Sequence, residues 1–491
     1  MSQGIERWTF TDADFAAFDR RLRENLAAFR AVVARPGFGE GPPTLGAELE
    51  LAIVDAEGRA APLNAELLAR SRDAHLTVEI DRFNLEYNLT PVPAAGRPFA
   101  AMRAEMEAFR TALDAAAAAH GARVLAIGIL PTLEPSELTA AALTDRPRYR
   151  ALQDALRRLR HGPAEMRING AEPLAFTCDD VALEGANTSF QVHLRVPPNR
   201  FAAAYNAAQL ATGPALAVAG NSPLFLGHQL WDETRIALFK KVMDVRSVDD
   251  LTARRPTRVS FGYGWLREGA AELFAEIVAC FPPLMPIVSD AAADAGRDPP
   301  PLRELRLHNG TVWRWNRAIY DPDDGGHLRI ELRALPAGPT SLDMLANAAF
   351  LVGLTHALAG RIGPMLELMP FHFAETNFYR AARDGLSAQL LWPSETGVSP
   401  REEPAPALVR RLLPLAAEGL AGLGVADVDA APLLEVLAAR VESGQTGARW
   451  QRATLRSLEG EGVGRREALQ ALVLRYAAMS REGTPVHAWA V

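Results

Sequence analysis

The chain has 491 residues, a formal net charge of −7, and 48% hydrophobic and 23% charged residues. These values are ordinary for a globular protein with a large core, and they exclude a global basic field that would attract nucleic acid. The only two lysines, Lys240 and Lys241, do not follow a G-x-x-x-x-G sequence, which excludes a Walker A phosphate loop. Two cysteines, Cys178 and Cys280, form neither a C-x-x-C motif nor a disulfide framework.

The N-terminal sequence predicts neither export nor membrane insertion. MSQGIERWTF lacks the basic and apolar regions of a signal peptide, and we expect no apolar run long enough to cross a membrane. These features favour a cytoplasmic protein that acts on small molecules, with no nucleic acid or membrane as partner. The oligomeric state is left open, a homodimer included.

The predicted elements follow from periodicity, taken in chain order. The first is a helix over 11–35, followed by a strand over 44–54, a turn at 55–58, a return over 59–63 and a helix over 64–71. Next come strands over 76–80 and 84–89, a helix over 98–120, a buried strand over 123–130, a helical stretch over 139–161 and a strand over 187–196. Helices are expected over 199–220 and 231–245, strands over 311–317 and 329–333, and then a long apolar helix that ends near 361. After 376 the chain is expected to be mostly helical, with a proline-rich linker at 400–406 and no internal repeat.

The strand over 44–54 carries two glutamates on one face. Glu48 and Glu50 alternate with apolar residues, so both point to the same side, about 7 Å apart. Like charges at this spacing repel each other, and such a strand faces solvent, a basic partner or a metal cation. The stretch Arg329-Ile-Glu331-Leu-Arg333 also alternates and places two arginines and a glutamate on one face. Together the two stretches predict a sheet with a charged floor.

Two further strands have a polar face backed by an apolar one. In 84–89 the polar face carries Glu86, and in 187–196 it carries Gln191 and His193. A lone histidine on a strand is more often structural than a ligand. The neighbouring Gln191 makes a functional role for His193 an equal alternative.

These strands together supply a set of residues suited to metal and phosphate chemistry: Glu48, Glu50, Glu86, Gln191, His193 and Glu331, flanked by Arg329 and Arg333. Oxygen-rich clusters with little nitrogen favour Mg²⁺ or Mn²⁺ over Zn²⁺. Four carboxylates exceed what one divalent ion needs, which indicates two or more ions, with the arginines neutralising a transferred phosphoryl group. The positions therefore predict metal-assisted phosphoryl transfer without a P-loop.

Four motifs in order carry a resemblance to a known family. They are G-A-E-L-E at 46–50, L-E-Y-N-L-T-P at 85–91, T-S-F-Q-V-H at 188–193 and R-I-E-L-R at 329–333. They resemble the sheet motifs of the glutamate–cysteine ligase family, most of all its second bacterial branch, the carboxylate–amine ligases, together with the plant-type enzymes. The resemblance covers about residues 40–360.

The resemblance implies an α+β, glutamine-synthetase-like catalytic fold, in which helices back a curved, mainly antiparallel sheet. It implies a ligase that uses ATP and Mg²⁺ (or Mn²⁺) to phosphorylate a carboxylate, which an amine then attacks. On this basis Glu48, Glu50, Glu86, His193 and Glu331 match metal ligands, Gln191, His193 and Arg333 line the nucleotide site, and Arg333 and Arg329 balance phosphate charge. Gln191 stands where many bacterial relatives have histidine.

The expected product is a γ-glutamyl amide, with an amino acid and an amine as substrates, glutamate and cysteine as first choices, and a place in glutathione biosynthesis. Arg235, Arg258 and Arg314 are candidates to select the substrate carboxylates. We expect an N-terminal helix in 1–40, the catalytic domain in 41–365 and a mostly helical region in 366–491. The alternatives are a guanidine kinase-like phosphotransferase of the same fold, a non-catalytic sensor that binds ATP or an amino acid, and metal-dependent hydrolysis, which would require more histidine.

Overall fold

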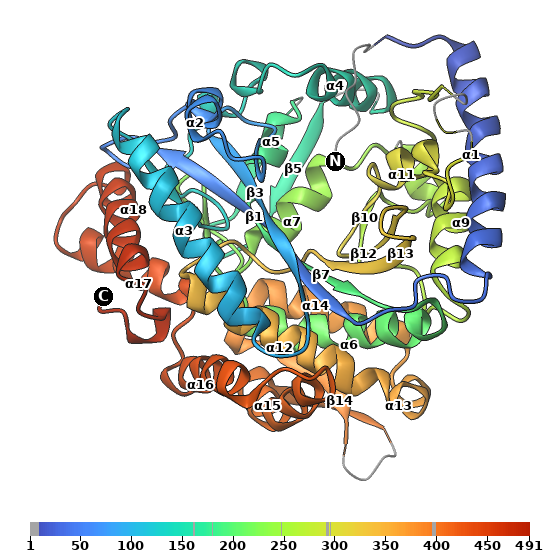
Figure 1. Cartoon of the computed structure of the whole chain (residues 1–491). Coiled ribbons are helices and arrows are strands. Elements are labelled where there is room, and N and C mark those ends of the chain that lie inside the picture. Colours follow the sequence, from blue (N-terminus) through green and yellow to red (C-terminus); the bar gives the residue numbers. More distant parts are fainter. Residues whose placement is uncertain are drawn as a thin grey trace.

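A seven-stranded sheet organises the computed structural model, which describes residues 9–160, 163–178, 180–246, 248–290, 294, 296–394 and 399–491 (Figure 1). Its strand order is β12–β13–β7–β1–β3–β2, and β4 pairs with β1 off this path. The strands are β1 (Thr44–Val54), β2 (Leu76–Val78), β3 (Asn84–Pro93), β4 (Arg123–Leu125), β7 (Phe190–Arg195), β12 (Asn316–Asp321) and β13 (His327–Leu332). Every pairing within this sheet is antiparallel, and the predicted α+β architecture with a mainly antiparallel sheet is confirmed.

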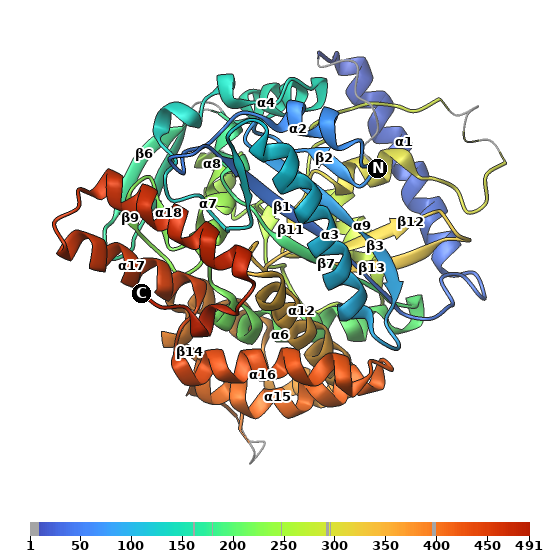
Figure 2. The ribbon, with the colours of Figure 1, turned by 60° about the vertical axis from the view of Figure 1, so that its left-hand side comes forward.

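The apolar face of this sheet packs on helices. Leu49 and Leu51 of β1 are buried, and α3 (Pro98–Ala118) contacts β3 and β4 on this side. Helices α6 (Phe201–Ala219) and α12 (Ser341–Ala359) lie against each other, and α6 contacts β12 and β13 while α12 contacts β7. A further layer, α15 (Ala405–Gly422) and α16 (Asp427–Ser443), covers α12 from outside (Figure 2). The opposite face of the sheet is therefore free to carry polar side chains.

Helix α12 is the one described helix that is long and apolar enough to cross a membrane, with a mean hydropathy of 1.4 over its best window. The sequence-based expectation that no apolar run reaches this length was therefore wrong. Of that window, 78% is buried inside the protein, because α6, α15 and α16 surround the helix. Gly353 and Gly419 permit the close crossing of α12 and α15, since a Cβ on either would overlap the backbone of the other helix.

The remaining described helices and strands lie around the sheet and its helical layers. The helices are α1 (Asp12–Val33), α2 (Asn64–Ser71), α4 (Pro147–Leu159), α5 (Ala182–Gly185), α7 (Thr234–Val242), α8 (Val248–Thr252), α9 (Ala270–Cys280), α11 (Arg303–Asn309), α13 (Ile362–Leu368), α14 (Phe371–Asp384), α17 (Gly447–Gly460) and α18 (Arg465–Glu482). Two-stranded ladders join β5 (Ala164–Ile168) to β6 (Leu174–Cys178), β8 (Leu224–Phe225) to β9 (His228–Gln229), β10 (Val259–Ser260) to β11 (Trp313–Arg314) and β14 (Gln389–Pro393) to β15 (Pro400–Pro404). Thr11 and Asp14 form a capping box that starts α1.

Several predicted boundaries were wrong. The single strand expected over 311–317 is two strands in different sheets, because the buried Trp315 between them bonds by its N–H to Ser260 and by its carbonyl to Arg333. The expected linker at 400–406 is β15 and the first turn of α15, where proline is tolerated at a strand edge and at a helix start. Only 123–125 of the strand expected over 123–130 is paired.

Two predicted helices also begin later than expected. The helical stretch expected over 139–161 holds a short 3₁₀ turn at Ala140–Ala142 and then α4, which starts at Pro147. The helix expected from 231 begins at Thr234 instead, because the backbone N–H groups of Asp232 and Glu233 donate to the carbonyls of Arg383 and Ala382. Both cysteines are free thiols. The division of the chain into three parts stays a prediction.

Candidate functional site

Strand register gathers the predicted residues on the polar face of the sheet. Glu48 of β1 lies opposite Gln191 of β7, and Glu50 lies opposite Glu86 of β3. His193 of β7 lies opposite Glu331 of β13. Directly opposed residues have Cβ atoms about 5 Å apart, so four strands bring these side chains into one cluster. We call Glu48, Glu50, Glu86, Gln191, His193, Glu331 and Arg333 the carboxylate face.

The centre of the carboxylate face is a group with metal-ligand geometry. His193 Nε2 lies 3.2 Å from Glu48 Oε1 and 3.8 Å from Glu331 Oε1. One ligand atom from each residue falls within a 4.8 Å span. His193 Nε2 is buried, and neither carboxylate is aligned to make a good hydrogen bond with it, although Glu48 lies within 3.2 Å. A buried polar atom without a good hydrogen bond is unfavourable, and a divalent cation between the two carboxylates would satisfy it.

Two arginines keep Glu331 ionised in spite of its burial. Arg317 donates to both carboxylate oxygens, from Nε at 2.5 Å and from Nη2 at 2.9 Å. Arg333 Nη1 lies 3.3 Å from the same carboxylate. Burial disfavours the charged form of Glu331, but these guanidinium groups and His193 hold its pKa well below the usual range. Glu331 is therefore an anion available to a cation at neutral pH.

Gln191 connects the two sides of the carboxylate face. Its Nε2 donates to Glu50 Oε1 at 2.8 Å, while its Oε1 accepts a hydrogen bond from Arg333. Ser189 also donates to Glu50 Oε2, from its backbone N at 2.6 Å and from its hydroxyl at 3.0 Å. Burial raises the pKa of Glu50 even though Arg333 and Arg235 favour its charged form. The amide of Gln191 thus holds a carboxylate and a guanidinium in fixed positions.

Uncompensated negative charge accumulates on the β3 side of the face. Burial and then repulsion from Glu48 and Glu50 raise the pKa of Glu86 to about 8, and Asn88 donates to it at 2.8 Å. In contrast, burial is outweighed at Glu48, where attraction to His193 and Arg333 lowers the pKa. Carboxyl groups this close to one another share protons unless a cation neutralises them. The donor set therefore fits hard divalent ions such as Mg²⁺ or Mn²⁺.

Two more acidic residues border the β3 side of the carboxylate face, and neither was predicted from the sequence. Glu79 lies just beyond β2, and burial together with repulsion from Glu86 raises its pKa well above the usual value. Glu184 in α5 has a pKa raised to about 8 by burial and by the charge of Glu50. The alternation of the strand expected over 76–80 places Glu79 on its polar face, a signal that could have found it. No periodicity connects Glu184 to the sheet.

Arg317 is a third missed residue. The strand containing it was predicted five residues too early, which hid the alternation of Asn316–Asp321, where Arg317 and Asp321 share the less buried face. Arg329, predicted to balance phosphate charge, lies on the same face of β13 as Glu331. Its guanidinium instead pairs with Asp321 at 2.6 Å and with His327 at 3.0 Å. Its contacts in the described structure are outside the carboxylate face, so its phosphate role stays a prediction.

Of the three arginines proposed for substrate carboxylates, one borders the carboxylate face. Arg235 is buried, bonds to Glu233 at 2.9 Å and to the Ala334 carbonyl, and acts electrostatically on Glu50. Arg258 donates to the carbonyls of Thr311 and Pro282. Arg314 pairs with Glu276. The last two are therefore held by other parts of the protein.

Sequence comparison connects this face to a known family. A sequence model of "Glutamate-cysteine ligase family 2" matches residues 44–256, which include three of the four motifs. A protein named "Putative glutamate--cysteine ligase 2" from Salinispora arenicola is 36% identical over 124 residues. One named "Putative glutamate--cysteine ligase 2-2" from Mycolicibacterium vanbaalenii is 32% identical over 120 residues. These alignments cover 25% and 24% of this chain and 31% of each relative, less than a third of its length.

Structural comparison extends the likeness over most of the chain. The crystal structure of a glutamate–cysteine ligase from Francisella tularensis, solved in complex with AMP, superposes with a TM-score of 0.52 over 90% of both chains, at 11% identity. This likeness shows the fold, and the glutamine-synthetase-like catalytic fold expected from the motifs is confirmed. Together, the sequence match over 44–256 and the shared fold confirm the resemblance of this chain to glutamate–cysteine ligase family 2.

Proposed function

We propose that this protein is an ATP-dependent carboxylate–amine ligase. The observation that carries the proposal is the carboxylate face itself, where Glu48, His193 and Glu331 present ligand atoms to one point beside Arg333. A surplus of carboxylates next to fixed guanidinium groups is suited to holding the triphosphate of ATP through divalent cations. The family match supports the same class of reaction.

The residues present fit a divalent metal. Glu48, His193 and Glu331 would hold one ion, and Glu50 and Glu86, with Glu79 beside them, would hold further ions. Bound Mg²⁺ or Mn²⁺ would neutralise phosphate charge and lower the cost of placing ATP against this face. The lack of a well-aligned hydrogen bond at His193 Nε2 and the raised pKa of Glu86 both point to missing positive charge.

The chemistry proceeds in two steps. An oxygen of the acid substrate attacks the γ-phosphorus of ATP, and the bond to the bridging oxygen breaks, which releases ADP and leaves an acyl phosphate. The amine nitrogen then attacks the acyl carbon, inorganic phosphate departs and the nitrogen loses a proton. Arg333, held by Glu331 and Gln191, stabilises charge on the transferring phosphoryl group. No nucleophile from the protein is required.

The finer assignment is a γ-glutamyl ligase, with glutamate as the acid and cysteine as the first-choice amine, which would place the reaction in glutathione biosynthesis. It rests on the family resemblance. Arg235 is the proposed contact for a substrate carboxylate, since it is the candidate arginine that borders Glu50. The cytoplasmic location and the three-part division of the chain belong to the same proposal.

The test is phosphate release from ATP with Mg²⁺ and glutamate, with each amino acid or simple amine added in turn. We expect release that needs both glutamate and one amine, with the amide detected by mass spectrometry. Hydroxylamine in place of the amine should trap the acyl phosphate as a hydroxamate. A phosphorylated guanidine without amide would instead establish a phosphotransferase. ATP binding without turnover for any amine would point to a different acid substrate or to a sensor.

A further inference from the structure

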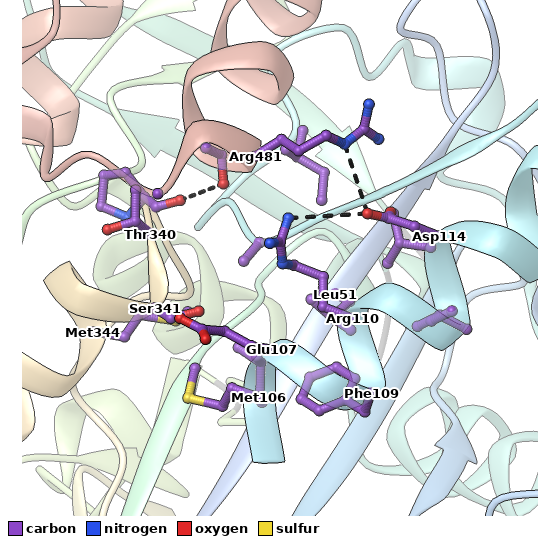
Figure 3. Close-up of a pocket in the computed structure, with 18 of the residues that line it drawn as sticks. Leu51, Met106, Glu107, Phe109, Arg110, Asp114, Thr340, Ser341, Met344 and Arg481 are labelled. Carbon is purple, nitrogen blue, oxygen red and sulfur yellow. Dashed lines mark hydrogen bonds and ion pairs between the residues drawn. The ribbon is translucent and has the colours of Figure 1, made fainter. Parts of the chain in front are cut away.

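A cavity lies on the opposite side of β1 from the carboxylate face. Its floor includes Leu49 and Leu51, the apolar neighbours of Glu48 and Glu50. Helix α3 forms one wall, while the start of α12 and the end of α18 form the others (Figure 3). Its volume is about 60 Å³. One water needs about 10–15 Å³ by this measure, so the cavity has room for roughly four to six non-hydrogen atoms.

The floor of this cavity is apolar, while its rim carries charged and hydroxyl side chains. Met106 and Phe109 of α3 and Met344 of α12 line the floor (Figure 3), together with Leu113. Side chains of this kind leave few hydrogen-bond partners for water, so filling the space with a short hydrocarbon chain would remove apolar surface from water. The cavity is thus suited to the tail of a small amphipathic molecule.

Charge is concentrated at one end of the cavity. Arg110 of α3 and Arg481 of α18 both point at Asp114, with nitrogen-to-oxygen distances of 3.9 and 3.7 Å (Figure 3). These separations exceed a hydrogen bond, and the two arginine side chains are 36% and 54% exposed at the mouth of the cavity. Two cations therefore share one distant carboxylate. Burial raises the pKa of Asp114 despite these two arginines.

The other end of the cavity is already balanced. Glu107 pairs with Arg103 at 2.7 Å and lies beside the first turn of α12, at Ser341 (Figure 3), where a carboxylate is favoured by the helix dipole. Among the charged side chains that line the cavity, three are arginines and two are acids. The excess positive charge therefore lies at Arg110 and Arg481, next to the apolar floor.

We propose that this cavity binds a small carboxylic acid with an apolar tail of about four to six carbons. The tail occupies the space above Leu49 and Leu51, and the carboxylate accepts hydrogen bonds from Arg110 and Arg481 at the mouth. A carboxylate between two guanidinium groups makes strong charge-assisted hydrogen bonds. The cavity and the carboxylate face lie on opposite sides of β1, so the acid does not occupy the proposed ATP site.

The test compares three probes of one length: hexanoate, hexanamide and hexylamine, measured by calorimetry on the full chain. We expect hexanoate to bind at least tenfold more tightly than the neutral amide, and the cationic amine not to bind. Simple fatty acids and apolar amino acids both carry this chemistry, so L-norleucine, which adds an α-ammonium group to hexanoate, distinguishes these sources. Equal binding of the three hexyl probes, or no binding of hexanoate, would overturn the proposal.

Matched variants locate the site. Arg481→Gln should weaken hexanoate binding at least tenfold, whereas Arg475→Gln, which removes an exposed arginine of α18 outside the cavity, should leave it unchanged. Ala477→Leu, which fills the cavity from α18, should also weaken it. Methyl NMR of the methionines should show hexanoate shifting Met106 and Met344. Unchanged affinity in both Arg481→Gln and Ala477→Leu would refute the site.

Discussion

Glu331→Gln separates the structural and catalytic roles of the carboxylate face. Glu331 is 1% exposed and is the counter-charge of Arg317 and Arg333. Glutamine keeps the shape of the side chain but removes its charge, which leaves two largely buried guanidinium groups uncompensated. Breaking a buried ion pair on one side costs about 3–5 kcal/mol of unfolding free energy. We expect a loss of this size together with loss of ATP turnover.

A second variant distinguishes loss of stability from loss of function. In Arg317→Gln/Glu331→Gln the closest buried pair is removed on both sides, so most of the lost stability should return. Turnover and Mn²⁺ binding should stay absent, because the metal ligand is still missing. Unfolding by urea reports stability, and electron paramagnetic resonance of free Mn²⁺ reports metal binding.

Two results would refute this reasoning. Full turnover or Mn²⁺ affinity in Glu331→Gln would show that Glu331 is not a metal ligand. A double variant no more stable than Glu331→Gln would show that the uncompensated charge of Arg317 is not the source of the destabilisation. A matched control is Glu66→Gln, which neutralises an exposed carboxylate on α2 and should change neither quantity.

Three further outcomes are expected. Glu48→Gln should abolish Mn²⁺ binding with little loss of stability, because this side chain is 25% exposed and has His193 as its close partner; a normal Mn²⁺ titration would contradict its role. In metal-free protein the unfolding free energy should fall as pH rises from about 4.5 to about 8, because folded Glu86 keeps its proton up to a pKa of about 8 and unfolded Glu86 does not. The unfolding free energy should fall by at most about 1.4 kcal/mol per pH unit. Urea titrations at several pH values, with a chelator present, measure this slope. An equally steep slope in Glu86→Gln would exclude Glu86 as the cause. Gly353→Ala should destabilise the protein by about 1–3 kcal/mol, because its Cβ would overlap the Ala416 carbonyl; an unchanged thermal midpoint would show that α12 and α15 can separate.

Local patterns in the sequence determined which side chains share a strand face. The alternation in Thr44–Val54 places Glu48 and Glu50 opposite Leu49 and Leu51, and the structure shows this arrangement. Period-two alternation is a property of the extended backbone, so it can be read without knowing the partners of a strand. The same reasoning identified Glu86, His193 and Glu331 as members of polar faces.

Tertiary structure alone decided which faces meet. The position of β7 between β1 and β13 brings His193 to both Glu48 and Glu331, and no local pattern specifies this strand order. The role of Arg317 as a partner of Glu331 follows only from the register of β12 with β13. The sequence did not indicate it, because the buried Trp315 separates β11 from β12. The cavity behind β1 is formed by α3, α12 and α18 together. More than 300 residues of chain separate α3 from α18. Strand pairing and helix packing depend on long-range burial of apolar surface, which local periodicity does not encode.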